Sequence, residues 1–154
     1  MHIDDATRAL TEELLHRSCE TLGCANCALW LASGDHLIPR LGHGPHAQKF
    51  IGNYRHPLDE GIISMVHASG MPFCENGITN NPNHSSRLDD MLGIQTDAMI
   101  AMPVVCKGDL AGVLTFVHTS PAGNSEEPST FSTFDLAEAE FASALTGRIL
   151  DSME

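Results

Sequence analysis

The stretch EGIISMVHASGMPF, residues 60–73, decides the fold of this chain. It predicts a short apolar helix over 62–69, enclosed by Gly61 and Gly70, followed by a brief strand over 71–75. Glycine tolerates the backbone angles of a sharp entry and exit, so such a helix can lie across a sheet as one wall of a cavity. A second stretch, AMPVVCKGDLAGVL at residues 101–114, predicts two buried strands joined by a tight hairpin turn at Lys107-Gly108.

The sequence on either side predicts the remaining elements. Apolar spacings of three and four predict a first helix over 3–22, and a capping pattern from Ser132 to Asp135 opens a last helix. Pro39 indicates an edge position for its strand. Helices at both ends and strands joined by hairpins predict an α+β fold, with an antiparallel sheet, both long helices on one face and a pocket on the other. The other expected elements are strands at 24–31, 36–41, 98–106 and 110–118, a loop with one helical turn at 42–55, and a short helix at 85–92.

The composition excludes several classes of protein. A chain of 154 residues with 42% hydrophobic residues is expected to form a single domain over 1–154. Its net charge of −12 and its eight scattered Lys and Arg residues argue against nucleic-acid binding, because phosphates require clustered cations. No apolar run approaches the roughly 18 residues of a membrane span. No secretory signal opens the sequence, so we expect a cytoplasmic protein whose five cysteines stay thiols.

Six motif pieces occur in a characteristic order along the chain. They are the glycine-opened helix 61–69, Met71-Pro72, Gly93-Ile94-Gln95-Thr96, Met102-Pro103, Gly112-Val113-Leu114 and Phe134-Asp135. In this order they resemble the signature of GAF domains, over about residues 7–153. The resemblance implies a PAS- and profilin-related fold and a sensor module that binds a small molecule on one face of its sheet, without chemistry of its own.

The resemblance also implies where that ligand would lie. The pocket is expected between the sheet and the segment 52–93, and the sequence does not identify a cofactor or the ligand. Separately, Ala139, Ala142 and Thr146 recur at spacings of three and four, and this small-residue stripe predicts a homodimer through the terminal helices; a monomer whose last helical turn frays is the alternative. The last helix has no stop signal, which favours an effector domain of kinase or cyclase type in a longer parent chain. The candidate lining residues, which could instead simply fill the core, are Trp30, Met65, Val66, His67, Cys74, Leu92, Thr96, Met99 and Phe116.

Cysteine and histidine patterns offer metal or redox chemistry as an alternative. Cys19, Cys24 and Cys27 have the spacing of iron–sulfur ligands, but Cys24 and Cys27 on one strand would point to opposite faces, so we expect buried thiols and no metal site. His43 and His46 flank a Gly-Pro pair, and with His56 and His84 they are expected to be solvated surface residues.

Two further functions are weighed against the sensor. A GAF-type free methionine sulfoxide reductase carries cysteines in the glycine-bracketed helix and the following loop. Here the helix 62–69 and the loop 76–96 contain none, and Cys74 alone lacks a resolving partner, so we expect no catalytic residues. A ligand-free dimerisation module would instead show a collapsed pocket filled by Met65, Met99 and Phe116. Bilin attachment lacks its Cys-His pair, and a phosphorylated ligand would have only Arg55 and Arg87 as cationic partners.

Overall fold

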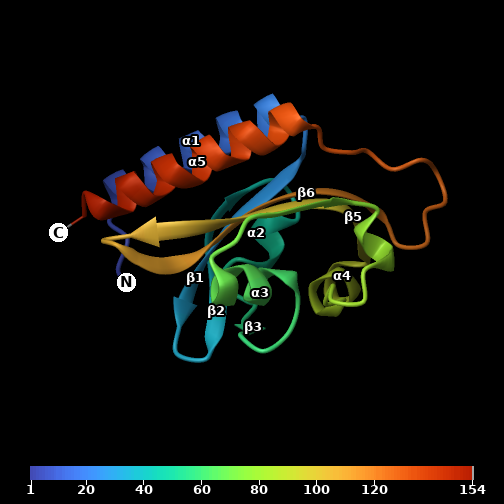
Figure 1. Ribbon diagram of the computed structural model, residues 1–154, viewed down its shortest axis with the longest axis horizontal. Helices are drawn as coiled ribbons and strands as arrows, with labels where there is room; N and C mark the ends of the chain where they lie inside the picture. Colours follow the sequence, from blue (N-terminus) through green and yellow to red (C-terminus); the bar gives the residue numbers. More distant parts are fainter. Residues whose placement is uncertain (154) are drawn as a thin grey trace.

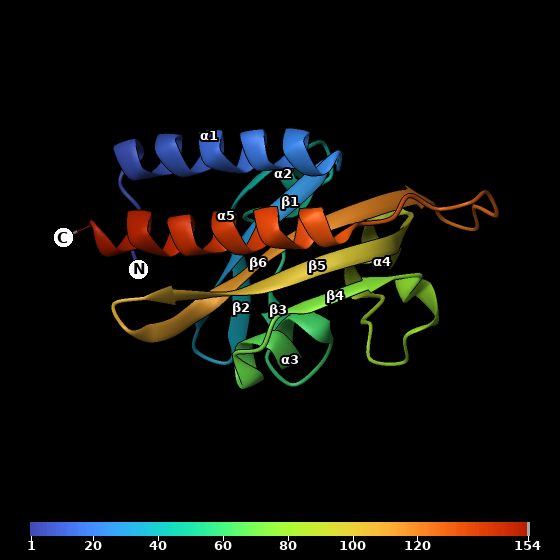
Figure 2. The ribbon, with the colours of Figure 1, turned by 45° about the horizontal axis from the view of Figure 1, so that its top comes forward.

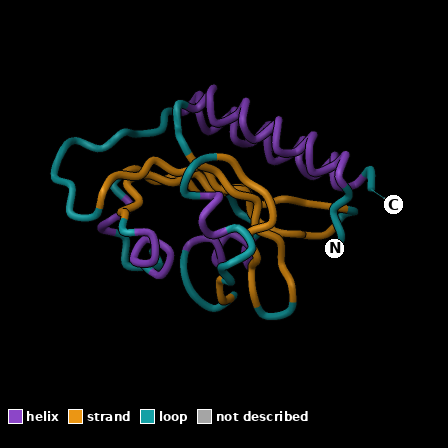
Figure 3. Tube along the Cα trace, turned by 180° about the vertical axis from the view of Figure 1, so that it is seen from behind, coloured by secondary structure: helices purple, strands orange, loops and turns teal. Residues whose placement is uncertain are grey.

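Two long helices lie side by side on one face of a six-stranded sheet (Figure 1). The computed structural model describes residues 1–153. The helices run antiparallel, and the short helices lie on the other side of the sheet (Figures 2 and 3). All strand pairs are antiparallel, in the order β3-β2-β1-β6-β5-β4. The elements are α1 Asp5–Leu22, β1 Asn26–Ser33, β2 His36–His43, α2 Ala47–Phe50, β3 His56–Pro57, α3 Ile62–Ser69, β4 Phe73–Asn76, a 3₁₀ turn Ile78–Asn80, α4 Arg87–Leu92, β5 Ile94–Cys106, β6 Asp109–Pro121 and α5 Thr133–Asp151.

This arrangement confirms the expected α+β fold. The glycines and capping residues that predicted the element boundaries lie at the ends of the helices and strands. The helix predicted over 62–69 has those bounds, between Gly61 with φ 83° and Gly70 with φ 69°. Lys107 and Gly108 both adopt positive φ, 54° and 80°, in the two-residue turn between β5 and β6. Ser132 and Asp135 form the reciprocal capping box that opens α5.

The strand β2 differs from expectation, because it is not the edge of the sheet. It lies between β1 and β3, so the edge position inferred from Pro39 is wrong for the strand as a whole. The two-residue strand β3 pairs only with His36 and Leu37. Pro39, which has no backbone N–H to donate, therefore faces no partner strand on that side. On the other side, the pairing with β1 shifts register next to Pro39 in a bulge.

The helix α5 packs tightly onto β5 through small residues. Ala139, Ala142 and Thr146 are fully buried against the sheet and α1. A Cβ on Gly147 would collide with the backbone carbonyl oxygen of Val105. The small-residue stripe predicted to contact a second copy is therefore an intramolecular contact, which corrects that part of the dimer prediction.

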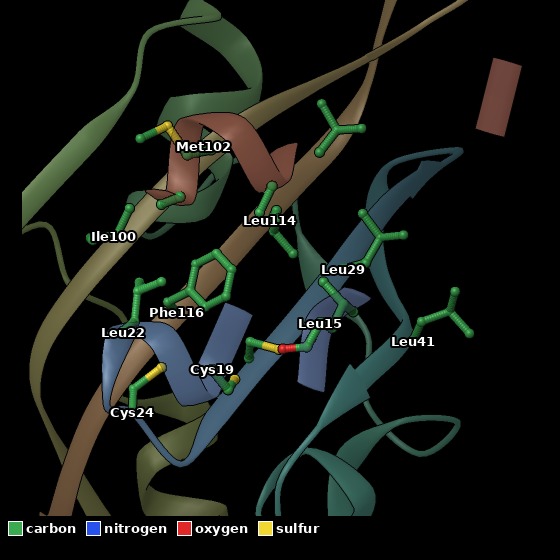
Figure 4. Packing of buried hydrophobic residues seen from close by; sticks show 14 of the residues in the cluster. Leu15, Cys19, Leu22, Cys24, Leu29, Leu41, Ile100, Met102, Leu114 and Phe116 are labelled. Atoms are coloured by element: carbon green, nitrogen blue, oxygen red, sulfur yellow. The ribbon is translucent and has the colours of Figure 1, made fainter. Parts of the chain in front are cut away.

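Each central strand divides its side chains between two cores. On the helix side, Ile100, Met102, Leu114 and Phe116 pack with residues of α1 (Figure 4). On the other side, Met99, Ala101 and Val113 pack with Trp30 and residues of α2 and α3. The period of two along a strand makes this division, and it places Phe116 in the helix-side core rather than in a pocket.

Three cysteines gather where α1 meets β1. Gly23 in the left-handed conformation ends α1 in a Schellman motif, with hydrogen bonds from Gly23 N to Glu20 O and from Cys24 N to Cys19 O. Because Cys24 precedes β1, the strand alternation does not apply to it. Cys19, Cys24 and Cys27 all lie buried on the helix side, and Figure 4 labels the first two. The argument that Cys24 and Cys27 point to opposite faces is therefore wrong.

The Cys19 and Cys24 thiols are nevertheless poor ligands and nucleophiles, because their pKa values are raised. The thiols of Cys24 and Cys27 lie 3.8 Å from the carbonyl oxygens of Asn26 and Leu15, respectively. Hydrogen bonding to Cys19 and burial raise the pKa of the Cys24 thiol far above its usual range. Across residues 1–153, no group of three His, Cys, Asp or Glu side chains is arranged to bind a metal ion. In the same residues, no helix has both the length and the apolar character needed to cross a membrane.

Candidate functional site

A cavity of about 80 Å³ lies between the sheet and the layer of short helices. Its floor comes from β1, β5 and β6, and its walls come from α2, the segment before α3, α3 and α4. The helix layer α1 and α5 lies on the opposite side of the sheet (Figure 2). The residues that line it are Asn26, Cys27, Ala28, Trp30, His46, Phe50, Tyr54, His56, Gly61, Ile62, Ile63, His84, Ser85, Leu88, Asp89, Leu92, Ile94, Thr96, Met99, Thr115, Val117 and Thr119.

Aromatic rings form one side of the cavity around Trp30. Its indole N–H donates to Thr115 Oγ1 at 3.0 Å, which fixes the ring against β6. The ring stacks on Phe50, with centroids 5.5 Å apart and planes within 15°. Tyr54 meets Trp30 edge-on at 6.0 Å. These contacts satisfy the only polar atom of the indole and leave an apolar surface beside the cavity.

Next to Trp30, a hydrogen-bonded chain connects Tyr54, His56 and the start of α3. The Tyr54 hydroxyl lies 2.7 Å from His56 Nδ1, and His56 Nε2 lies 2.8 Å from the Glu60 carbonyl oxygen. Burial lowers the pKa of His56, so its imidazole is neutral at pH 7. A carbonyl only accepts, so Nε2 carries the proton and Nδ1 accepts from Tyr54. Burial also raises the pKa of Tyr54 to about 12. Gly61 is required here, because a Cβ would lie 2.9 Å from His56 Nε2.

The helix α4 covers the cavity and is anchored to β5 through Asp89. Its carboxylate accepts from Thr96 N at 2.8 Å, from Thr96 Oγ1 at 2.8 Å and from His84 Nε2 at 3.1 Å. A six-residue helix has little stability of its own, so these bonds and the left-handed Gly93 fix its position.

An ion pair joins the starts of α3 and α4 at the rim of the cavity. Arg87 donates from Nε to Glu60 Oε2 at 2.7 Å and places Nη2 2.7 Å from Oε1. Ser85 Oγ donates to the same Glu60 Oε2 at 2.9 Å. Hydrogen bonds from Arg87 and Ser85 lower the pKa of Glu60 to about 2. The charge of the Arg87 guanidinium is therefore already neutralised by Glu60.

The start of α2 is fixed to β1 beside the cavity, and its neighbour His46 carries an unpaired ring nitrogen. Asn26 Oδ1 accepts from His46 N at 2.9 Å and from Ala47 N at 3.3 Å, which fixes the start of α2. The imidazole Nδ1 of His46 is buried without a hydrogen bond. Buried polar atoms are normally paired, so this nitrogen is an unsatisfied atom within the wall, and a water-sized probe does not reach it.

Four of the nine predicted residues line this cavity: Trp30, Leu92, Thr96 and Met99. Val66 is buried in the core beside it, and His67 does not reach it. Met65 is 51% exposed on the outer side of α3, where it borders a separate open hollow with Leu58 and Pro82. Cys74 is exposed on β4, and Phe116 lies on the opposite face of the sheet. The expectation that these five line the cavity is corrected by these positions.

Sequence reasoning missed most of the wall. Phe50, Tyr54 and His56 lie in a segment without periodicity, and its position depends on packing against Trp30. His56 and His84 were expected on the surface, yet both are enclosed in the cavity wall. A signal was present for β6, because the alternation that places Leu114 and Phe116 with the helices leaves Thr115 and Val117 for the cavity.

The architecture assigns the chain to a class of α+β domains in which one antiparallel sheet separates a layer of long helices from a cavity. The sequence profile of the GAF domain matches residues 7–149, and the chain belongs to the GAF domain family. No curated protein matches the chain in sequence.

Solved GAF-fold structures are similar to this chain over most of its length. The GAF domain of a Coxiella burnetii phosphoenolpyruvate-protein phosphotransferase is 18% identical, with a TM-score of 0.76, 94% of this chain covered and 82% of that chain. The type II free methionine-R-sulfoxide reductase of Thermoplasma acidophilum is 15% identical, with a TM-score of 0.74 and coverage of 95% and 93%. The PixJ GAF domain of Thermosynechococcus elongatus is 14% identical, with a TM-score of 0.71 and coverage of 95% and 85%. At these identities, the likeness shows the fold alone.

Proposed function

We propose that this chain is a regulatory GAF domain that binds a small molecule in the cavity without converting it. The observation that carries the proposal is the cavity itself, with the aromatic rings of Trp30, Phe50 and Tyr54 along one wall. Clefts that combine apolar walls with a few polar atoms are the usual ligand sites of proteins.

The strand β5 offers a route from the cavity to the terminal helices. Thr96 and Met99 of β5 line the cavity, while Ile100 and Met102 pack in the helix-side core. The helix α5 contacts the same strand at Gly147, where a Cβ atom would collide with the backbone carbonyl oxygen of Val105. Because packed elements move as units, a shift of β5 on ligand binding would be passed to α5.

The distribution of cysteines supports binding rather than catalysis. Cys27 borders the cavity through its strand, but its thiol lies 3.8 Å from the Leu15 carbonyl oxygen, in the helix-side core. Cys74 is largely exposed on β4, and the partial desolvation of its thiol raises the pKa of that group. A reductase would consume free methionine sulfoxide in the presence of a thiol reductant, and we expect no turnover. Turnover that is lost in Cys74→Ser would replace the sensor proposal with the reductase.

Ligand binding can be measured directly through Trp30, the single tryptophan of the chain. A screen of small molecules by melting temperature should give compounds that stabilise the protein by linkage and also change the Trp30 emission. If no compound in a broad screen does both, the cavity is a packing defect and the proposal is wrong.

We also propose a homodimer through the outer face of the two long helices. Leu10 of α1 and Phe134 and Phe141 of α5 are 57%, 86% and 62% exposed, which is unusual for such large apolar side chains. They replace the small-residue stripe as the expected contact. Sedimentation should give a dimer that Phe141→Glu converts to a monomer, while the matched variant Glu140→Gln on the same helix stays dimeric. A wild-type monomer at micromolar concentration would remove the dimer. The five free thiols support a reducing, cytoplasmic location for this assembly.

A further inference from the structure

We infer that residues 79–93 form a lid over the cavity, and that the ion pair between Glu60 and Arg87 holds this lid closed. The inference rests on the proposed function and adds to it the way in which a ligand enters. It follows from the exposure of the cavity wall, from the burial of the elements around it and from the contacts between the lid and the rest of the domain.

The cavity is partly open, yet its aromatic wall is closed to solvent. Trp30 and Phe50 line it and are only 3% and 6% exposed. Flat apolar rings of this kind are what a ligand site uses for contact. A molecule that contacts them therefore needs more room than the cavity now provides, and one of its walls has to move outward.

The walls differ in how firmly they are held. The helix α2 buries Ala47 and Phe50, and α3 buries four of its eight residues. None of the described residues 79–95 is buried, and Leu88 and Leu92 of α4 pack only partly against the core. Segments with few buried apolar contacts open at a low free energy, so the lid is the wall that moves.

The lid is joined to the sheet along one side. Ile78, just ahead of it, is fully buried, and Asn81 Nδ2 donates to Glu75 Oε2 of β4 at 2.8 Å. At the other end, Asp89 accepts two hydrogen bonds from Thr96 of β5. Because β4 and β5 are neighbouring strands, these contacts form the axis about which the lid turns.

On the side of α3, the lid is held by the carboxylate of Glu60. Ser85 Oγ and Arg87 Nε donate to it at 2.9 and 2.7 Å. Glu60 is itself fixed to the wall, because its carbonyl oxygen accepts from the buried His56. The side chains of Glu60 and Arg87 are 35% and 59% exposed, so water competes for this pair and its rupture costs little.

Outward movement of the lid joins the cavity to the open hollow beside Met65. Gly61, His84 and Ser85 line both spaces, and Glu60 borders the hollow. The contact between Ser85 and Glu60 therefore lies at their shared boundary. Its loss opens a route from solvent, through the hollow, to the aromatic wall.

Quenching of Trp30 phosphorescence by acrylamide tests the lid without a ligand. Acrylamide is uncharged, so its access to the single tryptophan depends on opening rather than on charge, and the long phosphorescence lifetime covers the timescale on which lids move. In Glu60→Ala and Arg87→Ala, we expect the quenching rate constant to rise about two- to fivefold, the factor by which an exposed ion pair shifts an equilibrium. High salt should raise it in the wild type and leave Glu60→Ala unchanged, because salt screens the pair.

Three controls and the double variant identify this pair as the contact that closes the lid. Asp90→Ala and Arg55→Ala each remove one charge from an exposed residue and should be quenched like the wild type. Phe116→Leu weakens the helix-side core and should also leave quenching unchanged, since the lid opens without global unfolding. The double variant of Glu60 and Arg87 should be quenched no faster than Glu60→Ala alone, because both substitutions remove the same contact. Circular dichroism confirms that each variant is folded.

The lid is overturned if Glu60→Ala and Arg87→Ala are quenched like the wild type, if their effects multiply in the double variant, or if Phe116→Leu is quenched as fast as they are. The proposed function is tested separately, by compounds that raise the melting temperature and change the Trp30 emission. It stands if such compounds exist although the lid is overturned, and it falls if a broad screen finds none although the variants behave as expected.

Discussion

Replacing Asp89 tests whether the short helix α4 is anchored by one carboxylate. Asp89→Ala removes three hydrogen bonds at once and leaves the backbone N–H of Thr96, which is 4% exposed, without a partner. Hydrogen bonds to charged groups contribute about 1.5–3 kcal/mol each when measured singly, and bonds to one group are not additive. We therefore expect the free energy of unfolding to fall by about 3 kcal/mol.

The variant Asp89→Asn separates the shape of the anchor from its charge. An amide oxygen in place of Oδ2 still accepts from Thr96 N and His84, and an amide nitrogen in place of Oδ1 donates to Thr96 Oγ1, because a hydroxyl can reverse its role. All three bonds survive in neutral form. Neutral bonds are about half as strong as charge-assisted ones, so the expected loss is about 1 kcal/mol.

Urea unfolding monitored by Trp30 emission measures these losses, with Asp90→Ala as the control. Asp90 is the exposed neighbour of Asp89 on α4, and its removal changes the net charge by the same amount. We expect it to change stability by about 0.5 kcal/mol or less. If Asp89→Ala is as mild as Asp90→Ala, or if Asp89→Asn is as damaging as Asp89→Ala, the anchoring argument is refuted.

Further predictions concern pH and packing. Because the pKa of Glu60 is lowered to about 2, the stability that its ionised form contributes is complete above the pKa of the unfolded state and is lost as pH falls toward 2. Glu60→Gln should therefore flatten the acid limb of a stability–pH curve, whereas the control variant Glu126→Gln should leave it unchanged. Because burial lowers the pKa of His56, the unfolded state binds more protons below about pH 6.5, so stability should decline there, and His56→Gln should remove that step in calorimetry. Phe116→Leu should destabilise the protein by about 1–2 kcal/mol while ligand affinity is unchanged, since Phe116 lies in the helix-side core; altered affinity without loss of stability would place it in the cavity instead. Gly147→Ala should lower the melting temperature despite the higher helix propensity of alanine, and an unchanged or higher value would contradict the close contact with Val105.

The fold was predictable because its boundaries are marked locally. Gly61 and Gly70, Lys107-Gly108 and the Ser132 cap each specify a turn or a helix end through their own backbone requirements. Face assignments were less secure, since they require the parity of each strand. That parity was overlooked for Phe116 and does not apply to Cys24, which precedes β1.

The candidate site was predictable only where strands supply it. Trp30 and Met99 belong to regular strands, so their faces follow from alternation. Tyr54 and His56 reach the cavity because the chain folds back over Trp30. Asp89 lies in the wall because it forms hydrogen bonds with Thr96, seven residues further along the chain. Such contacts have no local signal, and no periodicity distinguishes a buried histidine from a solvated one.

The alternation of β1 and β6 has a consequence for how such a domain can diversify. Positions 28, 30, 115 and 117 face the cavity, while their immediate neighbours 27, 29, 114 and 116 face the helices. Each strand therefore carries two alternating sets of side chains, one set that lines the cavity and one set that packs against the long helices. Substitutions at the cavity-facing positions can create a new ligand specificity without disturbing the packing of the helix-facing positions. A single-residue insertion, by contrast, moves every following side chain of the strand to the opposite face of the sheet, unless a β-bulge accommodates the extra residue.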